Sequence, residues 1–178
     1  TQGVSSAASD VYKRQEWDVV VASTLQRCAL FAAEFATARG LPLQLDPRLR
    51  EYHFGRWQGV PVAEIDRDEG AALGRFWSDP LRYPPPEAEP FEAFCARLAA
   101  ALDAIVATYP AQRVLVVTHG GAIRALRCLV AGDGFGHMTE LAVPHASLHP
   151  LRWPPMTVAT AQALSLIHIS EPTRQEAI

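Results

Sequence analysis

The chain has 178 residues, of which 49% are hydrophobic, and its formal net charge is −3. This length predicts one domain, large enough to bury a core without metals or disulfides. The slightly negative charge excludes the strongly basic surface that marks proteins binding nucleic acid or anionic membranes.

The three cysteines, Cys28, Cys95 and Cys128, are widely spaced and lie in apolar surroundings. An odd number of isolated cysteines favours reduced core residues of a cytoplasmic protein over a disulfide framework. No Cys/His cluster suggests a metal. No apolar run reaches the ~20 residues of a membrane span, and the N-terminus lacks the apolar centre of a signal peptide. We therefore expect a cytoplasmic protein with no metal or other cofactor.

The two ends of the chain differ from its middle. Residues 1–15 are small and polar without a helical period, and residues 164–178 differ from the Ala/Arg/Leu/Pro-rich body. Both ends resemble translated sequencing-adapter sequence; the alternative is an ordinary disordered tail at each end. We expect a domain over residues 16–155. A non-native or disordered tail over 1–15 would precede it, and a tail over 156–178, non-native from about 164, would follow.

The first elements of this domain follow from short apolar patterns. Residues 18–22 form an apolar, β-branched run that is typical of a buried strand. Ser23 or Thr24 can cap the helix that follows to Arg39, and the glycine after that helix is a typical C-cap. A brief strand is expected over 43–45.

The middle of the chain alternates helices with irregular segments. Residues 49–59 are loop-like, with glycines among aromatic rings, and residues 62–76 favour a helix. Residues 78–90 hold five prolines and cannot form a regular element. An amphipathic helix is predicted over 91–109, ended by Pro110.

An apolar strand over 114–118 then stops abruptly at His119, and a helical pattern over 122–131 follows two glycines. Alternating residues predict a last strand over 143–151. Strands that alternate with helices favour a mostly parallel sheet covered on both faces, a three-layer α/β sandwich.

His119 is the first candidate functional residue. It follows a buried strand at the sheet edge where ligands bind in open α/β folds. A helix N-terminus at that edge favours an anion, and Gly120 lets the backbone approach a ligand closely. The pattern predicts phosphate chemistry with His119 in the site. The alternative is a purely structural histidine.

Two other motifs carry candidate side chains. Arg27 lies in the first turn of its helix, where the helix dipole disfavours a cation, and a bound phosphate would compensate. The alternative is a solvated surface arginine. Glu51 lies among the aromatic rings of residues 49–59 and is a candidate general acid. Alternatively, this segment packs as a lid on the core with Glu51 in solvent.

In this order and spacing the three motifs resemble those of the histidine phosphatase superfamily, also called the phosphoglycerate mutase-like family. Residues 22–27 are similar to its Ser-Ser-Pro-Leu-x-Arg element. Residues 49–59 are similar to Leu-x-Glu-x-x-x-Gly-x-Trp-x-Gly, and residues 114–121 to the second-histidine motif. The resemblance covers nearly all of residues 16–153. Within the family it is closest to the bacterial α-ribazole phosphatase branch.

The resemblance implies a phosphoglycerate mutase-like fold and a metal-independent phosphomonoester hydrolase that acts through a phosphohistidine on a small phosphorylated metabolite. The branch implies α-ribazole 5′-phosphate, an intermediate of cobalamin biosynthesis. Arg27 would grip phosphate oxygens and Glu51 would protonate the leaving alcohol. His119 would hydrogen-bond the phosphoryl group and stabilise its oxygens with positive charge.

The same resemblance implies three substrate-binding residues. Ser23 and the Gly120 amide would be secondary contacts, and His145 would either line the pocket or simply pack. The tripeptide 88–90, Ala-Glu-Pro, stands where many relatives have Gly-Glu-Ser or Gly-Glu-Thr. A hydroxyl contact is therefore not expected there.

The family's nucleophile is the histidine of an Arg-His-Gly motif after its first strand, and this chain contains no Arg-His-Gly. An imidazole suits that task because its neutral nitrogen is nucleophilic near pH 7. Residues 1–15 occupy the place of that strand. We therefore expect a truncated domain whose first strand and nucleophile motif are missing. Such a chain would be nearly inactive and poorly stable, with unpaired strand edges.

Two other functions remain open. The chain could be a non-catalytic, degenerate phosphatase domain that binds a phosphorylated ligand through Arg27 and His119. It could also belong to a phosphoglycerate mutase-type transferase. The oligomeric state does not follow from the sequence.

Overall fold

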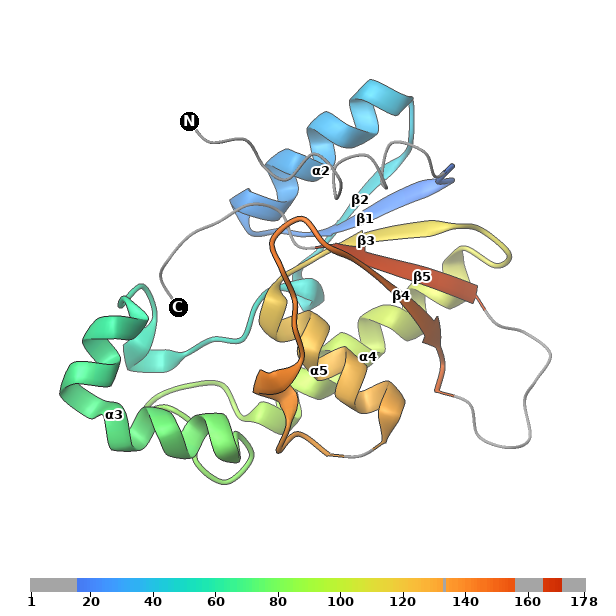
Figure 1. The fold of residues 1–178 in the computed structure, drawn as a ribbon. Coiled ribbons are helices and arrows are strands. Elements are labelled where there is room, and N and C mark those ends of the chain that lie inside the picture. The colour runs from blue at the N-terminus through green and yellow to red at the C-terminus, as the bar shows by residue number, and fades with distance from the viewer. Residues whose placement is uncertain (1–15, 133, 156–164, 171–178) are drawn as a thin grey trace.

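The computed structural model describes residues 16–132 and 134–155, together with the backbone of residues 165–170 (Figure 1). Its centre is one five-stranded sheet in the order β2-β1-β3-β5-β4. Neighbouring strands are parallel except for the β4–β5 pair. In sheet order the strands are β2 (Leu43–Asp46), β1 (Val19–Ser23), β3 (Val114–Val117), β5 (Ser165–Ser170) and β4 (Leu148–Trp153).

Alternate residues of the two central strands β1 and β3 face opposite layers. One face, which includes Val21 and Val116, packs against α4 (Phe91–Thr108) and α5 (Gly120–Ala131). The other face packs against α2 (Gln26–Arg39). Burial on both faces explains why these strands are continuous apolar runs. The predicted three-layer α/β sandwich with a mostly parallel sheet is confirmed.

The register of β1 on β3 positions the site. Ala22 pairs with Val117, so that the carboxyl ends of both strands meet at one edge. Ser23 and His119 are thereby brought together, although they are 96 positions apart in the sequence. Thr118 Oγ1 donates a hydrogen bond of 2.7 Å to the Leu49 carbonyl and fixes the following loop against the same edge.

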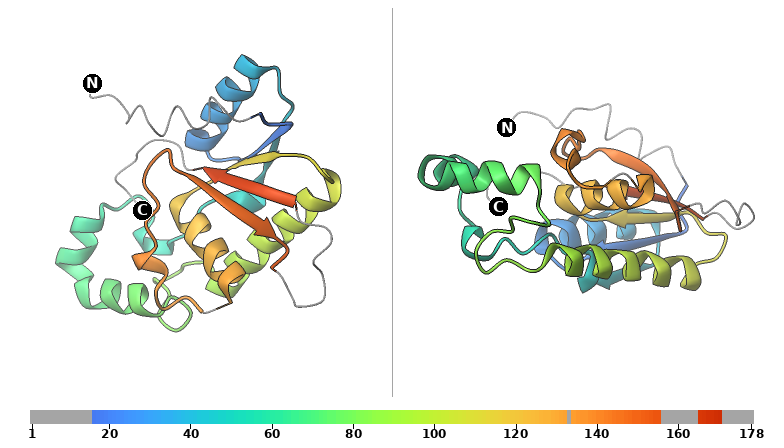
Figure 2. Two further views of the ribbon diagram at one scale, coloured as in Figure 1. Left: turned by 45° about the vertical axis from the view of Figure 1, so that its right-hand side comes forward. Right: turned by 90° about the horizontal axis from the view of Figure 1, so that it is seen from below.

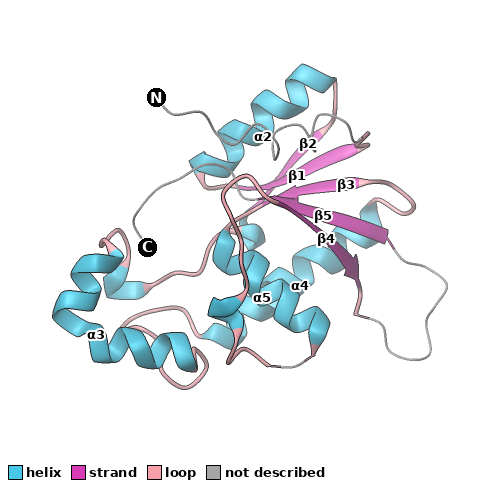
Figure 3. Ribbon diagram, viewed as in Figure 1, coloured by secondary structure: helices cyan, strands magenta, loops and turns pink. Residues whose placement is uncertain are grey.

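We call residues 49–59 the acid loop. It contains the 3₁₀ turn η2 (Gly55–Trp57) and runs from the sheet to α3 (Val62–Ser78), as Figure 3 shows. Helix α3 is kinked at Glu69 and stands apart from the sheet (Figures 1 and 2). Its Phe76 packs on the rings of the acid loop, with the Tyr52 ring centroid at 5.9 Å. Aromatic packing therefore fixes this loop in a definite shape.

Two boundaries differ from the sequence predictions. The N-cap of α2 is Leu25, whose apolar side chain cannot accept a hydrogen bond, and the Ser23 hydroxyl instead accepts from the Leu25 amide at 3.3 Å and bonds to His119. The last strand begins at Leu148, five residues later than predicted. Ala146 has a φ of +55°, and a turn closes from Ser147 N to the Pro144 carbonyl, which interrupts the extended backbone.

Strand β5 is the largest difference. The sequence predicts a tail over residues 156–178 and unpaired edges in the sheet. Residues 165–170 instead pair with β3, from Val114 opposite Ile167 to Val117 opposite Ser170, and with β4 on the other side. The expectation of unpaired strand edges is therefore wrong for β3, which is paired on both sides. The tail predicted at 1–15, and the rest of 156–178, lie outside the described residues.

All three cysteines are buried, as predicted for core residues, and none forms a disulfide within the described residues. Within the described ranges, no helix is long and apolar enough to cross a membrane. In the same part of the chain, no three His, Cys, Asp or Glu side chains gather in a group that could hold a metal ion.

Candidate active site

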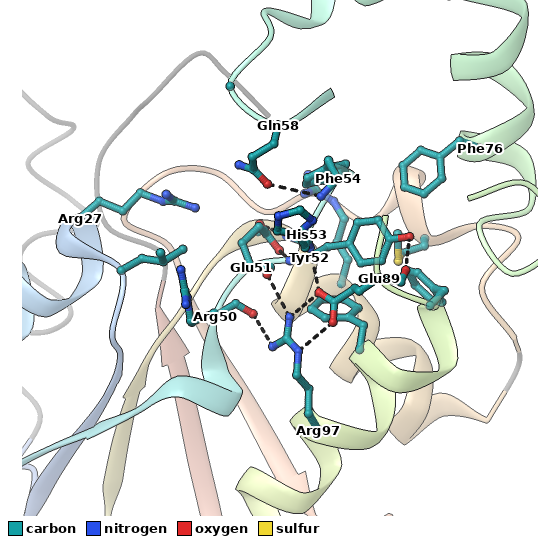
Figure 4. Close-up of a pocket in the computed structure, with 18 of the residues that line it drawn as sticks. Arg27, Arg50, Glu51, Tyr52, His53, Phe54, Gln58, Phe76, Glu89 and Arg97 are labelled. Atoms are coloured by element: carbon teal, nitrogen blue, oxygen red, sulfur yellow. Dashed lines mark hydrogen bonds and ion pairs between the residues drawn. The ribbon is translucent and has the colours of Figure 1, made fainter. Parts of the chain in front are cut away.

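A cavity of about 730 Å³ opens at the carboxyl edge of the sheet, between the acid loop and the start of α5 (Figure 4). Four of the six residues predicted for the site line it: Arg27, Glu51, Gly120 and His145. The other two, His119 and Ser23, are fully buried and do not line it.

His119 is enclosed by polar partners rather than open to the cavity. Its Nε2 lies 2.8 Å from Ser23 Oγ, and Cys28 Sγ lies 3.5 Å from each ring nitrogen. Burial, and then the positive charges of Arg27, Arg97 and Arg50, lower the pKa of His119 to about 3. The imidazole is therefore neutral at physiological pH, whereas the sequence analysis expected it to act through positive charge.

The N-terminus of α5 is capped by a carboxyl group of the chain itself. Glu51 Oε2 accepts from Gly121 N at 3.0 Å, and Oε1 accepts from Ala122 N at 3.1 Å. First-turn amides have no acceptor within their own helix, so this carboxylate satisfies two of them. A Cβ on Gly121 would lie 2.5 Å from Glu51 Oε1, so the close approach requires glycine. The Tyr52 amide donates to the same oxygen at 3.0 Å.

Three arginines of the cavity, Arg50, Arg97 and Arg124, were not predicted as site residues. Arg97 is bonded to Glu89 and to the backbone of the acid loop (Figure 4). Arg124 Nε donates to the Leu141 carbonyl at 3.0 Å. Arg124 could have been predicted from the sequence, since it lies one helical turn after Gly120 on the same face of the helix. No sequence pattern pointed to Arg97, because the residues that it contacts are distant in the sequence.

The electrostatics of the cavity favour an anion. Four arginines and two glutamates line it, which leaves two positive charges in excess when the histidines are neutral. Arg27 and Arg50 extend toward the same part of the cavity (Figure 4), and both act on the pKa of His119. Among the described residues, neither guanidinium forms an ion pair with a carboxylate. A phosphomonoester dianion would supply the missing charge.

Comparison with known proteins agrees with this chemistry. Glucosyl-3-phosphoglycerate phosphatase of Mycobacterium tuberculosis is 30% identical over 176 residues, covering 86% of this chain and 77% of that protein. A putative phosphoserine phosphatase 2 of Hydrogenobacter thermophilus is 26% identical over 137 residues, covering 77% and 67%. Some other mycobacterial relatives are matched over only 40% of their length.

Solved structures share the fold. The mycobacterial glucosyl-3-phosphoglycerate phosphatase in complex with VO3 superposes with a TM-score of 0.70 at 29% identity, covering 82% of this chain and 75% of that one. The α-ribazole phosphatase of Shigella flexneri has a TM-score of 0.63 at 23% identity, covering 79% and 71%, and supports the fold alone. The family model described as "Histidine phosphatase superfamily (branch 1)" matches residues 3–162. The chain therefore belongs to the histidine phosphatase superfamily, as its three motifs indicated.

Proposed function

We propose that this domain is built to hydrolyse small phosphomonoesters without a metal. The observation that carries the proposal is the pair Arg27 and Arg50, which face one cavity beside Glu51 with no carboxylate counter-ion in the described part of the chain. Guanidiniums supply here the positive charge that a metal provides in other phosphatases.

Each residue then has a defined task. Arg27 and Arg50 hold the oxygens of the phosphoryl group, and the Gly120 backbone lies close to it. A histidine nucleophile attacks phosphorus and forms a P–N bond while the P–O bond of the ester breaks. Glu51 gives a proton to the leaving alcohol oxygen. In the second step Glu51 takes a proton from water, whose oxygen attacks phosphorus while the P–N bond breaks, which releases inorganic phosphate and regenerates the histidine.

This chain does not contain the Arg-His-Gly motif that carries the nucleophile in the resemblance. We infer that it binds phosphate but turns over very little. Loss of a covalent nucleophile costs on the order of 10⁶ in turnover in a serine protease. The same absence favours the second candidate, a degenerate domain that only binds a phosphorylated ligand.

For the substrate, we propose a phosphorylated organic acid. Two relatives are named as a glucosyl-3-phosphoglycerate phosphatase and a putative phosphoserine phosphatase, and both of these compounds carry a carboxylate. Arg124 lines the same cavity and could pair with that carboxylate. The α-ribazole phosphatases are related to this chain at only 23–24% identity, so α-ribazole 5′-phosphate is the weaker candidate.

The test is to join residues 16–178 to an N-terminal strand that carries Arg-His-Gly and to measure phosphate release in the presence of EDTA. Phosphoserine, glucosyl-3-phosphoglycerate and α-ribazole 5′-phosphate are compared, and a variant with Ala in place of the added histidine is the control. Release that depends on that histidine supports hydrolysis. Phosphate binding by a folded protein without release of phosphate from any ester supports the binding module. Transfer to a second phosphoglycerate molecule supports a mutase.

A further inference from the structure

Arg97 lines the cavity, but its guanidinium is fully engaged by the protein. A guanidinium has five N–H donors. Nε donates to Glu89 Oε2 at 3.0 Å, and Nη2 donates to Glu89 Oε1 at 2.6 Å. Nη1 donates to the carbonyls of Arg48 and Arg50, each at 2.7 Å. Nη2 also donates to the Glu51 carbonyl at 2.9 Å. These five contacts match the number of donors, so Arg97 is not available to a ligand.

Glu89 extends this network to the other side of Glu51. Its Oε1 accepts from His53 N at 2.7 Å, and its own backbone N donates to the His53 carbonyl at 3.1 Å. The hydroxyl of the buried Tyr52 donates to the Glu89 carbonyl at 2.8 Å. Arg97 and Glu89 together therefore fix the backbone on both sides of the acid.

Glu51 is thus held at two points. Its carbonyl is bound by Arg97, and its carboxylate is bound by the amides of Gly121 and Ala122. We propose that Arg97, with Glu89, is a positioning residue that sets the location of the Glu51 carboxyl group without contacting the substrate. The proposal rests on the proposed function only in naming Glu51 as the acid.

A lysine cannot replace Arg97 in this role. Its ammonium is a point charge with three donors, whereas the planar fork of Arg97 meets five acceptors at once. Arg97→Lys therefore keeps the positive charge at this position but cannot form the five hydrogen bonds of the guanidinium. Arg48→Lys is the matched control: the Arg48 side chain forms a comparable bidentate pair with Asp46 and does not line the cavity, and only its backbone carbonyl, which the substitution keeps, accepts from Arg97.

The readout is amide hydrogen exchange by NMR on the full chain. The Gly121 and Ala122 amides donate to Glu51, whereas the Ile123 amide donates to the His119 carbonyl within α5 and is an internal reference. In Arg97→Lys we expect exchange at Gly121 and Ala122 to rise about tenfold or more, as in Glu51→Ala, with Ile123 unchanged. Glu89→Gln, which keeps the side-chain shape, should give a smaller rise, and Arg48→Lys should give none.

Folded Arg97→Lys and Glu89→Gln proteins with wild-type exchange at Gly121 and Ala122 would overturn the proposal. An equal rise in Arg48→Lys would also overturn it, because the effect would then be general loosening of the loop. Exchange is measured without turnover, so a failure of the proposed hydrolysis leaves this result independent.

Discussion

At the scale of single residues, the sequence neighbours His119 and Gly120 have different environments in the site. Gly120 lines the cavity, while His119 is fully buried against Ser23 and Cys28. Burial in low dielectric disfavours the protonated imidazole and lowers its pKa, and the nearby guanidiniums disfavour it further. The imidazole therefore contributes hydrogen bonds behind the wall of the site, and the arginines that line the cavity contribute the charge.

This burial predicts a pH dependence of stability. The pKa of His119 is about 3 in the folded chain and about 6.5 when unperturbed, so the unfolded state binds the proton more readily between these values. The stabilisation from a neutral His119 is complete above pH 6.5 and is lost as the pH falls toward 3. Its loss between pH 7 and 4.5 should be roughly 2–3 kcal/mol. Urea unfolding of wild type and His119→Gln at both pH values measures it, and parallel pH dependences would contradict it.

The arginine pair predicts a loss of anion affinity. Arg27→Ala and Arg50→Ala should each weaken binding of inorganic phosphate about 10- to 100-fold, since charge-assisted hydrogen bonds are worth roughly 1.5–3 kcal/mol. Arg56→Ala is the control, because Arg56 belongs to the acid loop but does not line the cavity. Titration calorimetry at low ionic strength measures the affinities. If Arg50→Ala bound inorganic phosphate with wild-type affinity, Arg50 would not be part of the anion site.

At the scale of elements, the acid loop takes its shape from the Pro-rich segment as well as from Arg97. Gly55 has a φ of +58°, and a Cβ at this position would lie 2.0 Å from the Pro86 carbonyl oxygen. The Arg56 amide donates to that same oxygen at 2.9 Å. The irregular segment predicted from its five prolines is therefore the surface on which the loop is fixed.

Gly55→Ala should consequently destabilise the chain more than a glycine substitution at an equally left-handed but open position. Gly40 is such a position, with a φ of +64° and open space where a Cβ would lie. We expect a loss of about 1 kcal/mol for Gly40→Ala, from backbone strain alone. The loss for Gly55→Ala should be larger, by about 1–3 kcal/mol, because the backbone must also move. Equal losses in urea unfolding would show that the contact with Pro86 is unimportant.

Elements with a strong local signal were predictable. The apolar runs of β1 and β3 and the amphipathic pattern of α4 gave the correct type, with bounds within about two residues. The start of β4 was wrong because a turn with a left-handed residue interrupts an alternating pattern. Arg97 was missed because its importance comes from carbonyls 46 to 49 residues away in the sequence. Patterns report local preferences, whereas this network exists only in the folded chain.

At the scale of the whole molecule, the sheet is completed by β5, a segment that the sequence analysis excluded from the domain. It pairs in the sheet with β3 along four residues and with β4 along all six of its residues. β4 has a second attachment, since Trp153 Nε1 donates to Asp103 Oδ1 of α4 at 2.7 Å. Without β5, β4 would therefore stay on the core, while β3 would keep β1 on one side and lose its neighbour on the other.

Removal of residues 156–178 should accordingly lower the urea midpoint of unfolding and promote association, because an exposed parallel edge can pair with another chain. Size-exclusion chromatography over a range of concentrations measures the association, and urea unfolding measures the midpoint. A matched control removes only residues 171–178 and retains β5. If the two truncated chains behave alike, the sheet does not depend on this strand.

The guanidiniums of Arg27 and Arg50, which have no carboxylate partner among the described residues, also affect the molecule as a whole. Repulsion between like charges in a shared cavity opposes folding, and a dianion bound between them converts that repulsion into attraction. By mass action, a phosphate concentration 100 times its dissociation constant would stabilise the native state by about 2.7 kcal/mol. The melting temperature of this protein should therefore depend on the choice of buffer anion, and phosphate should protect it from heat better than chloride at equal ionic strength.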